Sequence, residues 1–308
     1  MDALARSPSP AAAPLAPAEH TFTRPLEVIA PSRQTLPLVL ASPHSGSYYP
    51  PDFVASSRLD AHGLRRSEDA YVNELCAGAA ALGAPLLHAL FPRAYLDPNR
   101  EPYELDPAMF DGPLPHHCNV RSPRVAAGLG TIARMVASGA DIYRAKLPVA
   151  EAEKRIDTCY RPYHRALREL VEATRERFGH CVLVDCHSMP SGSAAHGNAE
   201  PPGGGSDIVL GDLHGQSCAP VVTEIARRVL SDLGFRVARN APYAGGYTTR
   251  HYGRPRDGVH ALQIEINRRL YMNEATFARL PSFPQVTAAL TAVAAALGAL
   301  TPEDLAGR

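Results

Sequence analysis

Two histidines and a glutamate stand on three separate apolar runs of this chain, and these residue types could build a metal-assisted hydrolytic site. His44 and His187 each follow such a run, and Glu265 lies inside a third run at 259–267. Imidazole nitrogens and carboxylate oxygens are usual protein ligands of Zn²⁺, and a catalytic zinc site keeps three of them and one open position. The pattern indicates a site at which one metal ion and one acid–base group act together.

The two histidines need a third, acidic ligand, and the sequence offers two neighbours. Asp69 and Glu68 are candidates, although acidic residues at this place could also serve only to begin a helix. Asp185 lies two residues before His187, so it points to the same side of an extended segment. It could orient the imidazole of His187 or only cap the following turn. A histidine taken alone is more often an ordinary core or surface residue, so the matching context of His44 carries weight.

Glu265 is a carboxylate between two isoleucines, where an unpaired charge would be costly. One interpretation is a structural ion pair with an arginine. The other is an environment that shifts its pKa for proton transfer. As a general base, Glu265 would take a proton from the attacking water and hand it to the leaving amine.

Two polar loops carry residues that could bind a substrate. A guanidinium group holds a carboxylate through two parallel hydrogen bonds, so Arg250, and Arg100 with its neighbour Asn99, are candidate clamps on an acidic or amino-acid substrate. The plain alternative is a solvated surface arginine. Gly246 could let the backbone approach a ligand closely, or it could only turn the chain.

The elements that must position these residues are typical of an open α/β sheet, in which buried strands deliver polar side chains at their carboxyl ends. We expect strands at 36–41, 84–90, 207–212, 235–239 and 259–267, with a central one beginning at Cys181. We expect helices opening at 68–69 and covering 149–178, 219–233 and 285–299, with loops at 95–102, 192–205 and 245–253. Pro162 predicts a kink or break in the helix 149–178, and the Gly- and Ser-rich loop 192–205 could cover the site.

Composition narrows the class of partner. The 308 residues include 31 basic and 31 acidic side chains, for a formal net charge of +0. This balance favours a small-molecule partner over nucleic acid or a membrane surface, and no run reaches the roughly 18 apolar residues of a membrane span. The six cysteines form no C-x-x-C pair, which predicts reduced thiols in a cytoplasmic protein. Residues 1–20, rich in Ala and Pro, are predicted to be a disordered tail before one catalytic domain at 21–308.

Other hydrolytic chemistries find less support. The sequence has no G-x-S-x-G motif that would place a serine nucleophile. Cys186 adjoins His187, but neighbours on a strand point to opposite faces and cannot form a thiol–imidazole pair.

At these same residues the chain resembles the N-formylglutamate amidohydrolase family. The matching blocks are SPHSG (42–46), SEDAYVNEL (67–75), LDPNR (96–100), RPYH (161–164), DCHSMPSG (185–192), DIVLGDLHGQSC (207–218), YAGGYTTRHYG (243–253) and LQIEINRRLYM (262–272). The family in turn is similar to the zinc carboxypeptidase and aspartoacylase fold. The resemblance therefore implies a single α/β domain built on a mixed β-sheet flanked by helices, of the zinc carboxypeptidase-like (phosphorylase/hydrolase-like) class.

The resemblance also implies an activity. Members of the family are zinc-dependent hydrolases, and we expect one zinc ion per chain. The expected reaction cleaves an N-acyl amino acid such as N-formyl-L-glutamate to formate and the free amino acid. In the family this reaction stands at the end of a histidine-degradation route. The resemblance makes His44, Asp69 and His187 the metal ligands and Glu265 the acid–base residue.

The same resemblance assigns substrate carboxylates to the Asn99-Arg100 pair and Arg250. The DCHSMP form and the lack of any tryptophan point to a divergent branch, so other substrates stay open. A metallopeptidase-like or cell-wall amidase activity, a non-catalytic binder of an acidic metabolite and, more remotely, a thiol hydrolase using Cys186 are the alternatives.

Overall fold

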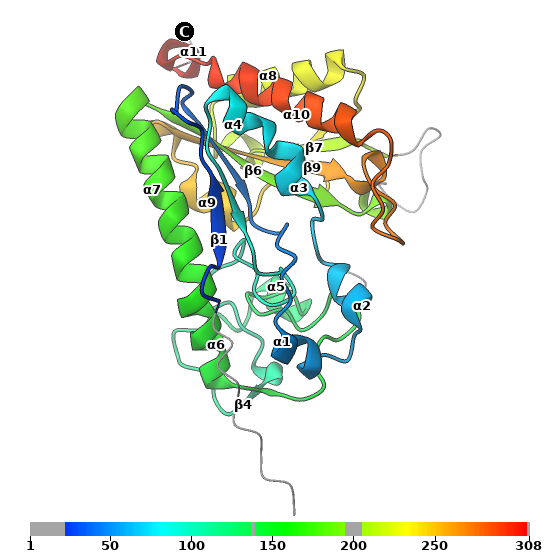
Figure 1. Cartoon of the computed structure of the whole chain (residues 1–308). Helices are drawn as coiled ribbons and strands as arrows, with labels where there is room; N and C mark the ends of the chain where they lie inside the picture. Colours follow the sequence, from blue (N-terminus) through cyan, green and yellow to red (C-terminus); the bar gives the residue numbers. More distant parts are fainter. Residues whose placement is uncertain (1–21, 137–138, 195–204, 307–308) are drawn as a thin grey trace, which may run out of the picture.

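A seven-stranded mixed sheet forms the centre of the computed structural model, which describes residues 22–136, 139–194 and 205–306 (Figure 1). Its order is β1-β3-β2-β6-β9-β7-β8, and its strands are β1 (Leu26–Ile29), β2 (Leu38–Ser42), β3 (Leu86–Ala89), β6 (Cys181–Met189), β7 (Ile208–Gly211), β8 (Val237–Arg239) and β9 (Val259–Asn267). The β1–β3 and β7–β9 pairs are antiparallel, and the other four are parallel. This is the mixed sheet that the sequence predicted.

The two central strands bring the acid–base residue beside a histidine. Strands β6 and β9 are buried along their whole length and pair in parallel from Cys181–Val259 to Met189–Asn267. Their β-branched and aliphatic residues suit a strand that is covered on both faces. The register makes His187 the direct neighbour of Glu265.

Helices cover both faces of the sheet (Figure 1). The helices are α1 (Pro51–Ser56), α2 (Ala61–Arg65), α3 (Val72–Cys76), α4 (Gly78–Leu82), α5 (Pro123–Ala126), α6 (Val149–Arg155), α7 (Arg161–Phe178), α8 (Pro220–Asp232), α9 (Tyr247–Tyr252), α10 (Phe283–Gly298) and α11 (Pro302–Leu305). One face, which carries Val184 and Ile264, packs against α3, α4, α8 and α10. The other face, which carries Leu183 and Ala261, packs against α7.

Shorter elements lie beyond the sheet. They are the two-stranded β4 (Phe110–Asp111) and β5 (Leu147–Pro148) and the 3-10 turns η1 (Pro107–Met109), η3 (Ser191–Ala194), η4 (Leu213–Gly215), η5 (Pro255–Asp257) and η6 (Arg268–Leu270). The β4–β5 pair belongs to a separate small core that includes Leu105, Phe110 and Ile132. Figure 1 shows β4 at the bottom of the molecule, below the central sheet.

The long predicted helix is continuous but changes its hydrogen-bonding pattern near Pro162. A π-helical segment, η2 (Ile156–Tyr160), joins α6 to α7. Proline has no N–H to donate to the preceding turn, and π-helical turns are one way in which a helix absorbs such a lost bond. The helix does not break at Pro162; the change from α- to π-helical hydrogen bonding lies just before that residue.

Some local predictions were wrong. The segment predicted as a loop at 245–253 contains helix α9, which follows the extended Gly246. Glu68 and Asp69 do not open a helix, because Tyr71 takes a left-handed φ of 67° and α3 begins only at Val72.

Four other predictions concern the tail, the cover, membrane spans and the cysteines. The tail at 1–20 and most of the predicted cover at 192–205 lie outside the described residues. Among the described helices, none is both long and apolar enough to cross a bilayer. All six cysteines are free thiols, as predicted.

Candidate metal centre

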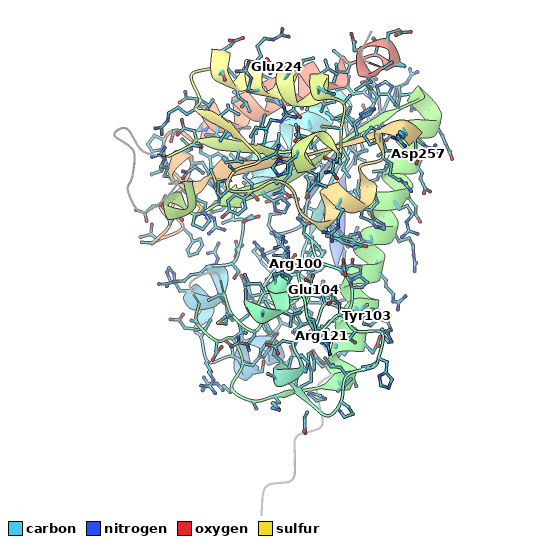
Figure 2. All side chains as sticks on the ribbon, turned by 180° about the vertical axis from the view of Figure 1, so that it is seen from behind. Arg100, Tyr103, Glu104, Arg121, Glu224 and Asp257 are labelled. Atoms are coloured by element: carbon cyan, nitrogen blue, oxygen red, sulfur yellow. The ribbon has the colours of Figure 1, made fainter. Side chains whose placement is uncertain are left out.

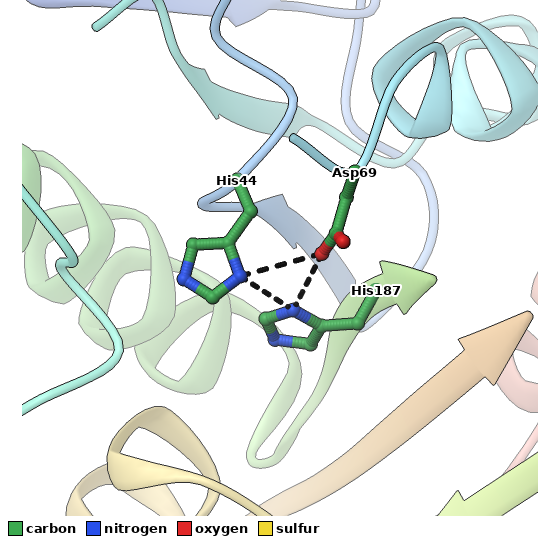
Figure 3. A group of neighbouring side chains, drawn as sticks. All are labelled: His44, Asp69 and His187. Carbon is green, nitrogen blue, oxygen red and sulfur yellow. Dashed lines mark hydrogen bonds and ion pairs between the residues drawn. The ribbon is translucent and has the colours of Figure 1, made fainter. Parts of the chain in front are cut away.

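Three side chains from three different segments converge on one point (Figure 3). His44 follows β2, Asp69 lies in the turn before α3, and His187 is on β6. The Nδ1 atom of His187 lies 3.1 Å from both Nδ1 of His44 and Oδ2 of Asp69, and the two latter atoms are 3.3 Å apart. All three side chains are buried.

The spacing of these three atoms fits a tetrahedral zinc site. With Zn–N and Zn–O bonds of about 2.0–2.1 Å, the ligand atoms of a tetrahedron lie about 3.3 Å from one another. The other ring nitrogens of His44 and His187 are engaged by carboxylates, so the two Nδ1 atoms are free to present lone pairs beside the Asp69 oxygen. Three converging lone pairs repel one another, and a cation would relieve that repulsion. The donor set therefore fits a divalent metal ion.

Each histidine is oriented by an aspartate behind it. Nε2 of His44 donates to Oδ1 of Asp97 across 2.7 Å, and Nε2 of His187 lies 3.0 Å from Oδ2 of Asp185. Burial alone would raise the pKa of Asp97, but the charges of Arg100, His44 and Arg93 hold that pKa well below its usual range. Such carboxylate–histidine pairs fix the ring and its tautomer for metal binding.

Asp69 is held by a different set of partners. Its Oδ1 accepts hydrogen bonds from Arg268 at 3.0 Å and from Ser188 at 3.1 Å, which leaves Oδ2 toward the two histidines. The neighbouring Glu68 points elsewhere and accepts two bonds from Arg65, each 3.0 Å long. The structure thus brings Asp69, and not Glu68, to the histidines.

We expect Asp185→Asn to lower metal affinity about 10- to 100-fold, because outer partners of metal-binding histidines typically contribute that much. The amide keeps the shape of the side chain but has no negative charge with which to accept a strong hydrogen bond from Nε2 of His187. Competition with a chelator of known affinity measures the change. Asp212→Asn, at a buried aspartate bonded to Thr223 and Asn240, is the matched control and should leave metal affinity unchanged. Equal affinities in both variants would refute the orienting role of Asp185.

Glu265 lies beside this group with one oxygen already fixed. Its Oε1 accepts a 2.9 Å hydrogen bond from Nε2 of Gln263, whose own oxygen accepts from the N–H of Gly246 at 2.7 Å. Burial, with added repulsion from Asp69 and Asp185, raises the pKa of Glu265 to about 7, against the attraction of His187 and Arg93. A carboxylate with such a pKa can both accept and return a proton near neutral pH.

A cavity of about 360 Å³ opens on the metal group and Glu265. The predicted residues Asn99, Arg100 and Gly246 line it. Asn99 is occupied within the protein, since its oxygen accepts from Thr248 N–H at 2.8 Å and its amide nitrogen lies 3.3 Å from Oδ2 of Asp185. Gly246 is required for close packing, because a Cβ there would overlap the Asn99 amide.

The two predicted arginine clamps are placed differently. Arg100 is buried at the cavity, where its guanidinium donates to the carbonyl oxygens of Leu129 and Asn99. Figure 2 shows it just below the sheet. Arg250 does not line the cavity; its exposed guanidinium pairs with Glu101 at 3.2 Å.

Comparison with known proteins identifies relatives of this chain. The family model described as N-formylglutamate amidohydrolase matches residues 36–272. The chain belongs to the N-formylglutamate amidohydrolase family. An N-formylglutamate deformylase of Pseudomonas putida is 30% identical over 242 residues, covering 78% of this chain and 83% of that protein. One of Pseudomonas aeruginosa is 30% identical over 268 residues, covering 86% and 93%.

Solved structures show the same relationship. The crystal structure of an N-formylglutamate amidohydrolase from Ralstonia eutropha JMP134 superposes with a TM-score of 0.83 at 38% identity, covering 92% of this chain and 98% of that one. A gene product of Agrobacterium tumefaciens, at 19% identity and a TM-score of 0.58, shares the fold.

Reasoning from the sequence missed several residues of this amidohydrolase site. Asp97 lies in the LDPNR block, two residues before Asn99, so its position in that block could have marked it as a site residue. Gln263 shares the face of β9 with Glu265, as the two-residue period of a strand requires. Arg93 and Arg124 also line the cavity, but nothing in their sequence neighbourhood distinguishes them from surface arginines.

Proposed function

We propose that this amidohydrolase cleaves the amide bond of an N-formyl amino acid, N-formyl-L-glutamate above all, to give formate and the free amino acid. The observation that carries the proposal is the convergence of His44, Asp69 and His187 beside Glu265. The substrate is that named for the Pseudomonas and Ralstonia relatives. A cytoplasmic location and a place at the end of a histidine-degradation route are part of the same proposal.

His44, Asp69 and His187 would hold one zinc ion, in keeping with their donor atoms and spacing. Bound there, zinc would supply Lewis-acid polarisation of the scissile carbonyl and would make a water molecule more acidic. The buried aspartates Asp97 and Asp185 keep the two imidazoles aimed at that position.

Glu265 is proposed to move the protons of the reaction. It takes a proton from the attacking water and delivers it to the amide nitrogen as the amine leaves. The hydrogen bond from Gln263 fixes Oε1, so that Oε2, for which the described residues offer no hydrogen bond, is the oxygen that exchanges the proton.

The amino-acid carboxylate is proposed to bind at Arg93 and Arg100. Arg93 holds Asp97 through Nε at 3.0 Å and is one of the residues that line the cavity. Arg100 lies beside it, 3.4 Å from the same aspartate. Asn99 and Gly246 then act as positioning residues. Arg250 has no role in this proposal, because its guanidinium lies away from the cavity.

The test is a substrate panel with zinc-replete protein: N-formyl and N-acetyl amino acids, short peptides and a cell-wall muropeptide. We expect formate release from N-formyl-L-glutamate, loss of that activity on chelation and recovery on zinc addition. Cleavage of peptides or muropeptide alone would instead support the metallopeptidase-like or amidase alternative. Binding without turnover of any compound would support the non-catalytic alternative.

The thiol alternative finds no support in the structure. Cys186 is buried on the opposite face of the sheet from His187, within the core beneath α10. Contact with the Cys76 thiol, together with burial, raises its pKa well above the usual range, which disfavours the nucleophilic thiolate. Cys186→Ala should therefore retain formate release.

A further inference from the structure

We propose that Arg124 binds the second carboxylate of the substrate and so makes the enzyme selective for acidic N-acyl amino acids. This inference rests on the proposed function and deepens it. It assigns specificity to a residue of the short helix α5, and not to Arg250.

The arginines that line the cavity differ in how many of their donors are already used. Arg268 uses all three of its guanidinium nitrogens within the protein, since they donate to Ser188, the carbonyl of Arg66 and Asp69. Arg100 is partly occupied by the carbonyls of Leu129 and Asn99. Both arginines therefore have part of their hydrogen-bonding capacity committed to the protein, and Arg100 contributes to the α-carboxylate site only with the donors that remain.

Arg124 is the contrasting case. It lies in the last turn of α5, its side chain is exposed at the cavity, and its guanidinium makes no hydrogen bond or ion pair with any residue that the structure describes. A second positive charge stands close by. Burial is the main cause that lowers the pKa of Arg100 to about 10; the attraction of Asp97 opposes it, and the nearby charges of Arg93 and Arg124 contribute to it. Like charges gathered at one wall of a cavity, with free donors, suit an anionic ligand.

The shape of the substrate decides which arginine meets which carboxylate. In an N-formyl amino acid the scissile nitrogen and the α-carboxylate share one carbon, so this carboxylate must stay near the metal group. Arg93 is near that group, since it holds Asp97 and is attracted by Asp69 and Glu265. The side-chain carboxylate of glutamate lies two methylene groups farther away.

Arg124 is placed to meet that distant carboxylate. It lies on the Arg100 side of the cavity, because Leu129 joins the two residues: its N–H donates to the carbonyl of Arg124 at 2.8 Å, and its own carbonyl accepts from Arg100 at 3.0 Å. Leu129, Ala133 and Met135, which follow Arg124 in the same stretch of the chain, also line the cavity and offer apolar contact to methylene groups. The glutamate side chain has two methylene groups and then a carboxylate. The apolar residues can contact the methylene groups, and the Arg124 guanidinium can bind the carboxylate.

The experiment compares N-formyl-L-glutamate with N-formyl-L-glutamine, which has the same shape and no side-chain charge. In the wild type we expect a preference for the acidic substrate. In Arg124→Met we expect kcat/KM for N-formyl-L-glutamate to fall about 30-fold or more, mainly through KM, as for loss of one partner of a charge pair. The value for N-formyl-L-glutamine should stay within about twofold. Arg121→Met is the matched control: Arg121 is exposed, does not line the cavity and lies farther below the sheet (Figure 2), so both values should be unchanged.

A binding measurement separates this inference from the proposed function. Calorimetric titration with L-glutamate and L-glutamine needs no turnover, and Arg124→Met should weaken only the binding of L-glutamate. If the wild type cleaves N-formyl-L-glutamate but Arg124→Met keeps its selectivity, the inference is overturned and the proposed function stands. If no N-formyl amino acid is cleaved, the proposed function fails, and the titration still decides whether Arg124 binds a side-chain carboxylate.

Discussion

Replacing Glu265 with glutamine is expected to lower kcat about 10²- to 10⁴-fold, the usual contribution of a positioned acid–base group. Glutamine has the same size and can keep a hydrogen bond with Gln263, but it cannot accept the proton of the attacking water or return one to the amine. The metal ligands are unchanged, so bound zinc should stay near one ion per chain. Steady-state kinetics with N-formyl-L-glutamate and elemental analysis of the same samples measure the two quantities.

The same change at Glu224 serves as the control. Glu224 is exposed on α8, far from the cavity, and is paired only with Arg227 among the described residues (Figure 2). Glu224→Gln should keep wild-type kcat and metal content. Full activity in Glu265→Gln would contradict the acid–base role, and loss of metal in that variant would make Glu265 a ligand instead.

Replacing His187 with alanine is expected to remove both bound zinc and activity. Loss of the ion takes away several kcal/mol of transition-state stabilisation, which corresponds to a fall in kcat/KM of about 10³-fold or more. Zinc should also raise the melting temperature of the wild type, because a ligand that binds only the folded state stabilises it, and should have little effect on His187→Ala. Kinetics, elemental analysis and thermal melts with and without zinc measure these effects.

The control here is a histidine of similar burial. His180 lies immediately before β6, at the opposite end of that strand, and one ring nitrogen is 3.0 Å from the carbonyl of Leu300. His180→Ala opens a similar cavity in the core and should keep its zinc. If His180→Ala loses as much zinc as His187→Ala, the loss reflects general destabilisation and not a missing ligand.

Much of the sheet could be predicted from the sequence, because its signals are local. The runs that form β6 and β9 are apolar and β-branched along nearly their whole length, and both end in polar residues at the carboxyl edge. The carboxyl ends of parallel strands share one edge of a sheet, so we predicted that His187 and Glu265 meet there, and the pairing of β6 with β9 confirms it.

Other parts of the site depend on tertiary contacts. Helix α9 was missed because the glycines before it and its short length of six residues look like a loop, whereas the bond from Thr248 N–H to Asn99 anchors its first turn. Asp69 and Glu68 are separated by their arginine partners. Arg65 binds Glu68 from three residues away, whereas the partner of Asp69 is Arg268, which is distant in the sequence.

The roles of the arginines were the hardest part of the site to predict from the sequence. A guanidinium binds a ligand only with donors that the protein has not already used, and sequence does not reveal that count. Arg250 adjoins a glycine-rich block yet pairs with Glu101 at the surface, while Arg124, in an unremarkable stretch, faces the cavity unpaired within the described part of the chain.

The most direct test is crystallography of the zinc-loaded protein with anomalous data collected on both sides of the zinc absorption edge. We predict one strong anomalous peak per chain, about 2.0–2.2 Å from Nδ1 of His44, Oδ2 of Asp69 and Nδ1 of His187. A zinc-replete crystal with no peak between these three atoms, or with its ion held by other residues, would contradict the account.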